Sequence, residues 1–254
     1  SGYTGYEKLN IAKKHLIPKQ VKKNGLKGSI IRFDTAAVEQ IISGYTAESG
    51  VRSLDRQIGA VCRKAAAEYL GGRQHITVTK KSLEKYLGAP SHTESNLPKK
   101  PTIGVSCGLA WTSVGGCTMP IEVSNMPGNG SLELTGSLGD VMKESAKTAL
   151  SLVRSMGDKL SLSKDFFKER DIHVHVPEGA VPKDGPSAGI TITTAMVSSF
   201  TGRAVRNDVA MTGEITLTGR VLPIGGLKEK SLAAVRDGIN KIIIPKANLR
   251  DTKE

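Results

Sequence analysis

Aromatic and cysteine residues are scarce in this sequence. Aromatic side chains make up 4% of its 254 residues, so we expect a core of Ile, Leu, Val and Ala. The three cysteines (Cys62, Cys107 and Cys117) are too few and too scattered for a disulfide framework or a zinc site. We therefore expect buried, reduced thiols in the cytoplasm or an organellar matrix, and no metal site.

Long apolar runs are absent as well. No hydrophobic stretch approaches the ~18–20 residues of a membrane helix, and the first ten residues lack the features of a signal peptide. We expect no membrane contact and interpret the N-terminus as a cut within a longer protein. Hydrophobic residues at 38% and charged residues at 24% are typical of a soluble globular protein.

Positive charge exceeds negative charge, and unevenly. Residues 1–98 carry 16 Lys and Arg against 8 Asp and Glu, whereas residues 99–254 carry 20 against 16. A basic half of this kind can contact nucleic acid without sequence preference. However, its lysine run (Lys19, Lys22, Lys23 and Lys27) has no interleaved aromatics to stack on bases, which favours a solvated face.

The first ninety residues are expected to be mostly helical. Apolar spacing predicts a helix over residues 7–16 that Pro18 interrupts, a helix that Asp34 caps, and a third that Ser53 caps and Gly71 ends. A short strand at 75–79 and a helix at 82–87 follow. We therefore assign residues 1–90 to a small helical domain.

A segment rich in Pro, Ser, Thr and Lys separates this domain from a mixed α/β part. We assign residues 91–102 to a linker and 103–254 to a second domain. Predicted strands cover 103–112, 117–124, 131–134, 172–176 and 241–244, and predicted helices cover 140–153, 187–200 and 228–237.

Ser187 lies in the sequence Gly-Pro-Ser-Ala-Gly (185–189), which matches the G-x-S-x-G pattern of serine hydrolases. The pattern alone is weak, because a glycine-rich turn before a helix often contains a capping serine. Small flanking residues nevertheless allow a turn sharp enough to expose the hydroxyl. A position at a helix N-terminus would also direct backbone N–H groups at a developing oxyanion.

A serine nucleophile needs a base, and the order of residues limits the choice. All five histidines precede Ser187, which excludes the order Ser, Asp, His. A triad of Asp184 with His173 or His175 is formally possible but crowded. Lysine is the other candidate, and the turn at 222–227 leads into a helix with Lys228 and Lys230 on different sides. Spacing does not decide between these two lysines.

Two long segments, VPEGAVPKDGPSAGITITTA (176–195) and MTGEITLTGRVLPIGGLKEKSLAA (211–234), resemble the catalytic blocks of the Lon family of ATP-dependent proteases. The resemblance covers nearly all of 103–254 and implies a serine endopeptidase with Ser187 as nucleophile and Lys230 as base. It implies that Thr212 hydrogen-bonds the lysine, and that Asp184 and Glu122 influence whether the site is open.

The N-terminal part resembles the helical lid of an AAA+ ATPase module. Its segment GVRSLDR (50–56) resembles the sensor-2 motif, which implies that Arg52 reaches nucleotide phosphates. The chain has no Gly-Lys dipeptide and hence no Walker A loop. The resemblance therefore implies that only the intact enzyme uses ATP and magnesium. It also implies a hexameric ring and unfolded proteins as substrates. The alternatives are a nucleic-acid-binding module and a noncatalytic lid.

Overall fold

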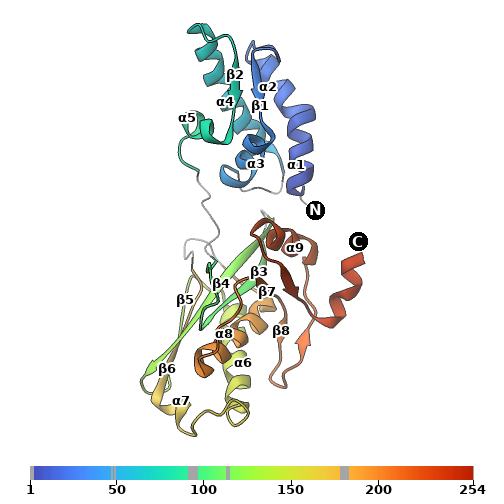
Figure 1. The fold of residues 1–254 in the computed structure, drawn as a ribbon. Helices are drawn as coiled ribbons and strands as arrows, with labels where there is room; N and C mark the ends of the chain where they lie inside the picture. Colours follow the sequence, from blue (N-terminus) through green and yellow to red (C-terminus); the bar gives the residue numbers. More distant parts are fainter. Residues whose placement is uncertain are drawn as a thin grey trace. The chain divides into compact units, whose positions relative to one another are not determined.

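The computed structural model describes residues 3–46, 48, 50–90, 97–112, 115–177 and 183–253. Residues 91–96 of the predicted linker and 178–182 of the first catalytic block lie outside this set. The chain divides into two compact units, one of residues 1–94 with 113–115 and one of 95–112 with 116–254 (Figure 1). The prediction of a helical part followed by a mixed α/β part is confirmed.

The first unit consists of helices around a two-stranded parallel sheet. Ile31 in β1 pairs with Ile76 in β2, and β1 was not predicted. The core contains the fully buried Ile41, Leu54 and Ile58. The elements are α1 (Gly5–Ile11), a π-helical segment (Ala12–Leu16), α2 (Ile17–Lys23), β1 (Ile31–Phe33), α3 (Thr35–Gly44), α4 (Arg52–Leu70), β2 (Ile76–Val78) and α5 (Leu83–Leu87).

Pro18 does not interrupt the first helix, so that prediction is wrong. The helical path runs from α1 through the π-helical segment into α2, where Pro18 occupies the first turn. A proline is tolerated in a first turn because its missing N–H would have no partner there. The wider π turn ahead of it gives the backbone a place to adjust.

The N-terminus of α4 is capped by a different residue from the one predicted. The helix starts at Arg52, and the carboxylate of Glu48 accepts hydrogen bonds from the backbone of Ser53 at 2.9 Å and Leu54 at 2.8 Å. Ser53 therefore lies inside the helix. A carboxylate at this end satisfies unpaired N–H groups and interacts favourably with the helix dipole. Gly71 follows the last residue of α4, as predicted.

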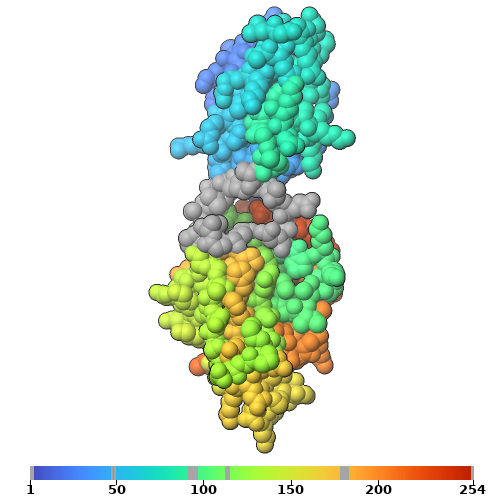
Figure 2. All heavy atoms as spheres, turned by 90° about the vertical axis from the view of Figure 1, so that its left-hand side faces the viewer, coloured from blue at the N-terminus to red at the C-terminus, as the bar shows by residue number. Residues whose placement is uncertain are grey.

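A six-stranded mixed sheet, in the order β10-β7-β3-β4-β6-β5, organises the second unit. In Figure 2 the golden β6 lies between the yellow-green β5 and the green β4. Atoms of these three strands are therefore exposed on the face shown. The strands are β3 (Val105–Thr112), β4 (Gly115–Pro127), β5 (Leu132–Thr135), β6 (Arg170–His175), β7 (Val209–Met211) and β10 (Lys241–Ile243). A separate antiparallel pair joins β8 (Glu214–Ile215) to β9 (Val221–Leu222).

Three long helices accompany the sheet. Helix α8 (Gly189–Thr201) packs on β3, α6 (Asp140–Ser155) packs on α8, and α9 (Leu227–Arg236) also contacts β3 (Figure 1). The core between them contains the fully buried Ile121, Val174, Ile192 and Met196. The short helix α7 (Phe166–Glu169) and the 3-10 segment Lys246–Lys253 were not predicted.

Asp140 is a residue type that commonly caps a helix, yet it does not cap α6. It is the first helical residue, and the carboxylate of Asp184 accepts a hydrogen bond from Met142 N at 3.0 Å instead. The cap thus comes from a residue 42 positions away in sequence. This bond ties the start of α6 to the segment just before Ser187.

Candidate active site

Ser187 lies in a tight turn in front of α8. The prediction placed it as the first residue of that helix, but residues Pro186–Ala188 form a separate 3-10 turn. Gly185 precedes the turn with φ +113°, a conformation that side-chain-bearing residues rarely adopt. Ser187 itself is half-buried, so its hydroxyl is held by the turn while remaining partly accessible.

The connection between β7 and β8 fixes this turn from the other side. Gly213 N donates to the carbonyl oxygen of Ser187 at 2.8 Å, and Ile190 N donates to the carbonyl oxygen of Gly213 at 3.1 Å. Gly189 has no space for a side chain, because an added Cβ would lie 2.9 Å from Ile215 N. Backbone contacts therefore determine where the Ser187 hydroxyl lies.

Lys230 approaches the same hydroxyl from the buried face of α9. Its Nζ atom lies 3.1 Å from Ser187 Oγ and 3.0 Å from Thr212 Oγ1. The whole residue is only 3% exposed. Thr212 Oγ1 can in turn donate to the carbonyl oxygen of Ser187 at 3.4 Å. Three residues from separate segments thus share one hydrogen-bonded group.

Burial lowers the pKa of Lys230 to about 8, against an ordinary value of 10.5, because the ammonium loses its hydration. The Cys117 thiol acts weakly in the opposite direction. The amine is therefore substantially neutral at mildly alkaline pH, as a general base must be. Cys117 was predicted as one more buried thiol, yet it is only half-buried and close enough to affect Lys230.

The choice between the two lysines follows from the packing of α9. Lys228 is exposed, whereas Lys230 is buried among the residues that hold Ser187. Asn248, which is 2% exposed, fixes the turn before α9, since it exchanges two hydrogen bonds with the backbone of Ile224 at 3.0 and 2.8 Å. Sequence reasoning missed Asn248, because nothing in its surroundings marks it as a partner of this turn.

Asp184 and Glu122 lie in different surroundings. Besides capping α6, Asp184 accepts a hydrogen bond from Gly185 N at 2.8 Å, so its carboxylate braces the backbone leading to Ser187. Glu122 is exposed on β4, directly opposite His175 of β6.

The two histidines are not arranged as a triad with Ser187. His173 Nε2 and His175 Nδ1 both contact Thr135 Oγ1, at 2.8 and 2.7 Å, and Asp184 is engaged with backbone N–H groups. Among the described residues the structure therefore supports a lysine rather than a histidine as the base. The described residues also contain no cluster of three or more His, Cys, Asp or Glu that could hold a metal ion.

Arg52 is exposed in the first turn of α4, so its guanidinium is accessible, while the N–H groups of Ser53 and Leu54 at this helix end already bond the Glu48 carboxylate. An arginine there fits a phosphate contact. The chain offers no Gly-Lys dipeptide for a phosphate-binding loop, so these residues supply only part of a nucleotide site. No described helix is long and apolar enough to span a membrane.

Two family models match the chain. Residues 77–254 match the family model of the Lon protease (S16) C-terminal proteolytic domain, and residues 22–81 match that of the Lon protease AAA+ ATPase lid domain. Neither model begins or ends at a predicted domain boundary (90/91 or 102/103), so both boundaries stay predictions.

Bacterial relatives resemble the chain over its whole length. It is 55% identical to Lon protease 1 of Bacillus subtilis (strain 168) over 100% of the chain and 33% of that protein. It is 54% identical to the Lon protease of Vibrio parahaemolyticus serotype O3:K6, and 53% identical to that of Finegoldia magna, with the same coverage. The chain thus spans about a third of the length of these curated relatives.

Proposed function

The chain belongs to the Lon protease family, and on that premise we propose that it hydrolyses peptide bonds with Ser187 as nucleophile and Lys230 as general base. The observation that carries this proposal is the contact of 3.1 Å between the buried amine and the hydroxyl. A neutral amine at this distance can accept the hydroxyl proton directly.

The reaction is acyl transfer in two steps. Lys230 accepts the proton of Ser187 Oγ as this oxygen attacks the peptide carbonyl carbon, and backbone N–H groups around Ser187 stabilise the oxyanion. The lysine ammonium then protonates the leaving amine as the C–N bond breaks. In the second step Lys230 takes a proton from a water molecule as its oxygen attacks the ester carbonyl carbon. It returns this proton to Ser187 Oγ as the bond between the acyl group and Oγ breaks, and the acid product leaves. This route uses no cofactor.

Three neighbouring residues support the dyad in this proposal. Thr212 orients the amine through its bond of 3.0 Å without adding a charge. Asp184 holds the backbone just before Ser187 through its hydrogen bond with Gly185 N. Glu122 lies opposite His175 at the end of β6, and the chain continues from there toward Ser187. Loss of either carboxylate would shift the site between open and closed arrangements.

Further proposals concern the longer protein. We propose that it takes unfolded proteins as substrates, uses ATP and magnesium with Arg52 contacting the phosphates, assembles as a hexamer, and is cytoplasmic, or lies in an organellar matrix. The exposed lysines of α2 (Lys19, Lys22 and Lys23) and the exposed Lys27 after it favour at most a nonspecific, salt-dependent contact with DNA. The family match does not favour a nucleic-acid module or a noncatalytic lid as the main function.

A fluorophosphonate probe tests the dyad directly, because it labels only activated serines. We expect mass spectrometry to find the label on Ser187, and labelling to stop in Ser187→Ala with the fold retained. Peptidase activity on a short fluorogenic peptide should disappear in the same variant. Ser151→Ala, an exposed serine on α6, is the matched control. Activity that persists in Ser187→Ala would refute the assignment of the nucleophile.

A further inference from the structure

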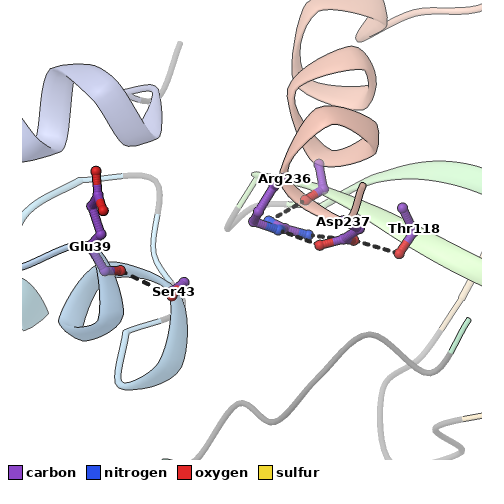
Figure 3. A network of polar contacts seen from close by, with 6 residues as sticks. Glu39, Ser43, Thr118, Arg236 and Asp237 are labelled. Carbon is purple, nitrogen blue, oxygen red and sulfur yellow. Dashed lines mark hydrogen bonds and ion pairs between the residues drawn. The ribbon is translucent and has the colours of Figure 1, made fainter. Parts of the chain in front are cut away.

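A polar network links the end of α9 to the start of β4. The carboxylate of Asp237 accepts hydrogen bonds from Thr118 Oγ1 at 2.6 Å and from Arg236 Nε and Nη2 at 2.9 and 3.1 Å (Figure 3). Arg236 Nη1 also donates to the carbonyl oxygen of Gly116 at 3.4 Å. Thr118 and Asp237 are 119 positions apart, so the network is a tertiary contact.

The position of Asp237 is unfavourable for α9 taken alone. It directly follows the last helical residue, where the carbonyl groups carry partial negative charge and a carboxylate is disfavoured. Its side chain is only 14% exposed, so solvent does not compensate for this charge. Arg236 and the hydroxyl of Thr118 compensate for the charge of Asp237. The contact with Thr118 of β4 therefore explains best why an acidic residue occupies this position.

The start of β4 also lies directly against the middle of α9. A Cβ added to Gly116 would overlap the carbonyl oxygen of Glu229 and lie 3.0 Å from Lys230 N. Cys117, the next residue, is near enough for its thiol to act on the Lys230 ammonium. Thus the same three residues of β4 contact α9 at the active-site lysine and again at its C-terminal end.

We propose that Thr118, Arg236 and Asp237 are positioning residues that fasten β4 along α9 and so keep the Lys230 amine buried against Ser187. The proposal rests on the proposed dyad. Among the described residues, the hydrogen-bond partners recorded for the amine are the hydroxyls of Ser187 and Thr212, which carry no charge at neutral pH. The proposal is that the packing of Gly116 against the backbone of Lys230 keeps this amine buried, and that burial makes it lose its proton more readily.

Thr118→Val tests this role, because valine keeps the shape of threonine and removes the hydroxyl. We expect the pKa of Lys230 to rise toward that of a solvated lysine. Each unit by which this pKa rises lowers the neutral fraction of Lys230 at pH 7 about tenfold. kcat should fall by that factor with KM for a short peptide unchanged, and should recover at high pH. Thr118→Ser, which retains the hydroxyl, should behave as the unmodified chain.

NMR titration of the Lys230 side chain gives a readout independent of catalysis. Thr118→Val and the milder Asp237→Asn should both raise its titration midpoint, whereas Thr118→Ser should not. An unchanged midpoint and pH profile in both variants, even with a lower Tm, would overturn the proposal and leave a merely structural network. Failure of the dyad itself would appear separately, as peptidase activity in Ser187→Ala.

Discussion

The Nζ atom of Lys230 lies 3.1 Å from Ser187 Oγ, although the two residues are 43 positions apart. One comes from a helix and the other from a turn before a different helix. Burial of the amine and exposure of the hydroxyl are both consequences of how α8 and α9 pack around β3. The predictions below therefore test the packing as much as the chemistry.

The peptidase rate should depend on pH through Lys230. In the proposed mechanism the neutral amine is the base. Because burial lowers its pKa to about 8, kcat/KM should rise with pH through a single ionisation near that value and level off above it. Below the midpoint, kcat/KM should fall roughly tenfold for each pH unit. A profile measured with an uncharged peptide checks this. A midpoint near 10.5 would mean that the lysine is not buried in solution.

Substitution of the two lysines by arginine should have unequal effects. Lys230→Arg should lower kcat/KM by about 10²–10⁴-fold, since guanidinium stays protonated and cannot serve as a base. Lys228→Arg should be mild, because Lys228 is exposed. Both variants are compared on one short peptide at pH 8.5. Equal losses would leave the choice of lysine unsupported, and a loss in Lys228→Arg alone would reverse it.

Thr212→Val should lower kcat without changing KM. The hydroxyl accepts from the amine at 3.0 Å and is 1% exposed, so its loss leaves the amine with one partner fewer in a buried site. A buried hydrogen bond of this kind contributes about 0.5–1.5 kcal/mol, which corresponds to up to about tenfold in rate. Thr212→Ser should retain most of the activity. Similar rates in all three chains would show that Thr212 does not orient the base.

The sequence predicted the features of the site that depend on local spacing. Gly185 and Gly189 around Ser187 indicated a sharp turn, and this turn exists as a 3-10 segment. Two lysines two positions apart indicated that only one could face inward. Which one does so depends on the face of α9 that packs inside, and spacing contains no information on that. The family resemblance selected Lys230, whose amine lies beside Ser187.

The features that the sequence did not predict depend on partners distant along the chain. Glu48 caps α4, Asp184 caps α6 from 42 positions away, and Asn248 holds the turn at Ile224. For the two helix caps, a nearer residue (Ser53 for α4 and Asp140 for α6) offered a plausible local interpretation. A polar side chain chooses among several possible partners only once the fold has placed them, so propensity and spacing alone favour the wrong cap.

ATP should neither bind tightly to the purified chain nor be hydrolysed by it. Arg52 alone cannot replace a phosphate-binding loop and its magnesium ligands. Calorimetric titration should show no saturation below about 1 mM ATP, and phosphate release should equal that of buffer. Arg52→Ala should leave both results unchanged. ATPase activity of the purified chain that is lost in Arg52→Ala would contradict the assignment of residues 1–90 to a lid without its nucleotide-binding core.

The burial of Lys230 should also appear in stability. Lys230 binds its proton more weakly in the folded chain, with a pKa of about 8 against 10.5, so between these values the unfolded chain holds more protons. The free energy of unfolding therefore rises with pH across this window, and the full penalty, at most about 3 kcal/mol, is present below pH 8. Lys230→Met removes the charge and keeps a similar volume. Because it also loses two hydrogen bonds of about 0.5–1.5 kcal/mol each, we expect a net gain of up to about 2 kcal/mol at pH 7.

This gain should shrink as pH rises toward 10.5, because the lysine is then neutral in both states. Urea unfolding of the two chains at pH 7, 8.5 and 10 measures the difference, in which the titration of all other groups cancels. Lys228→Met provides the matched control: its lysine is exposed, so the difference from the unmodified chain should be small and independent of pH. A constant difference for Lys230→Met would mean that the amine titrates as in water. It could not then serve as a base near neutral pH, and the mechanism would need another proton acceptor.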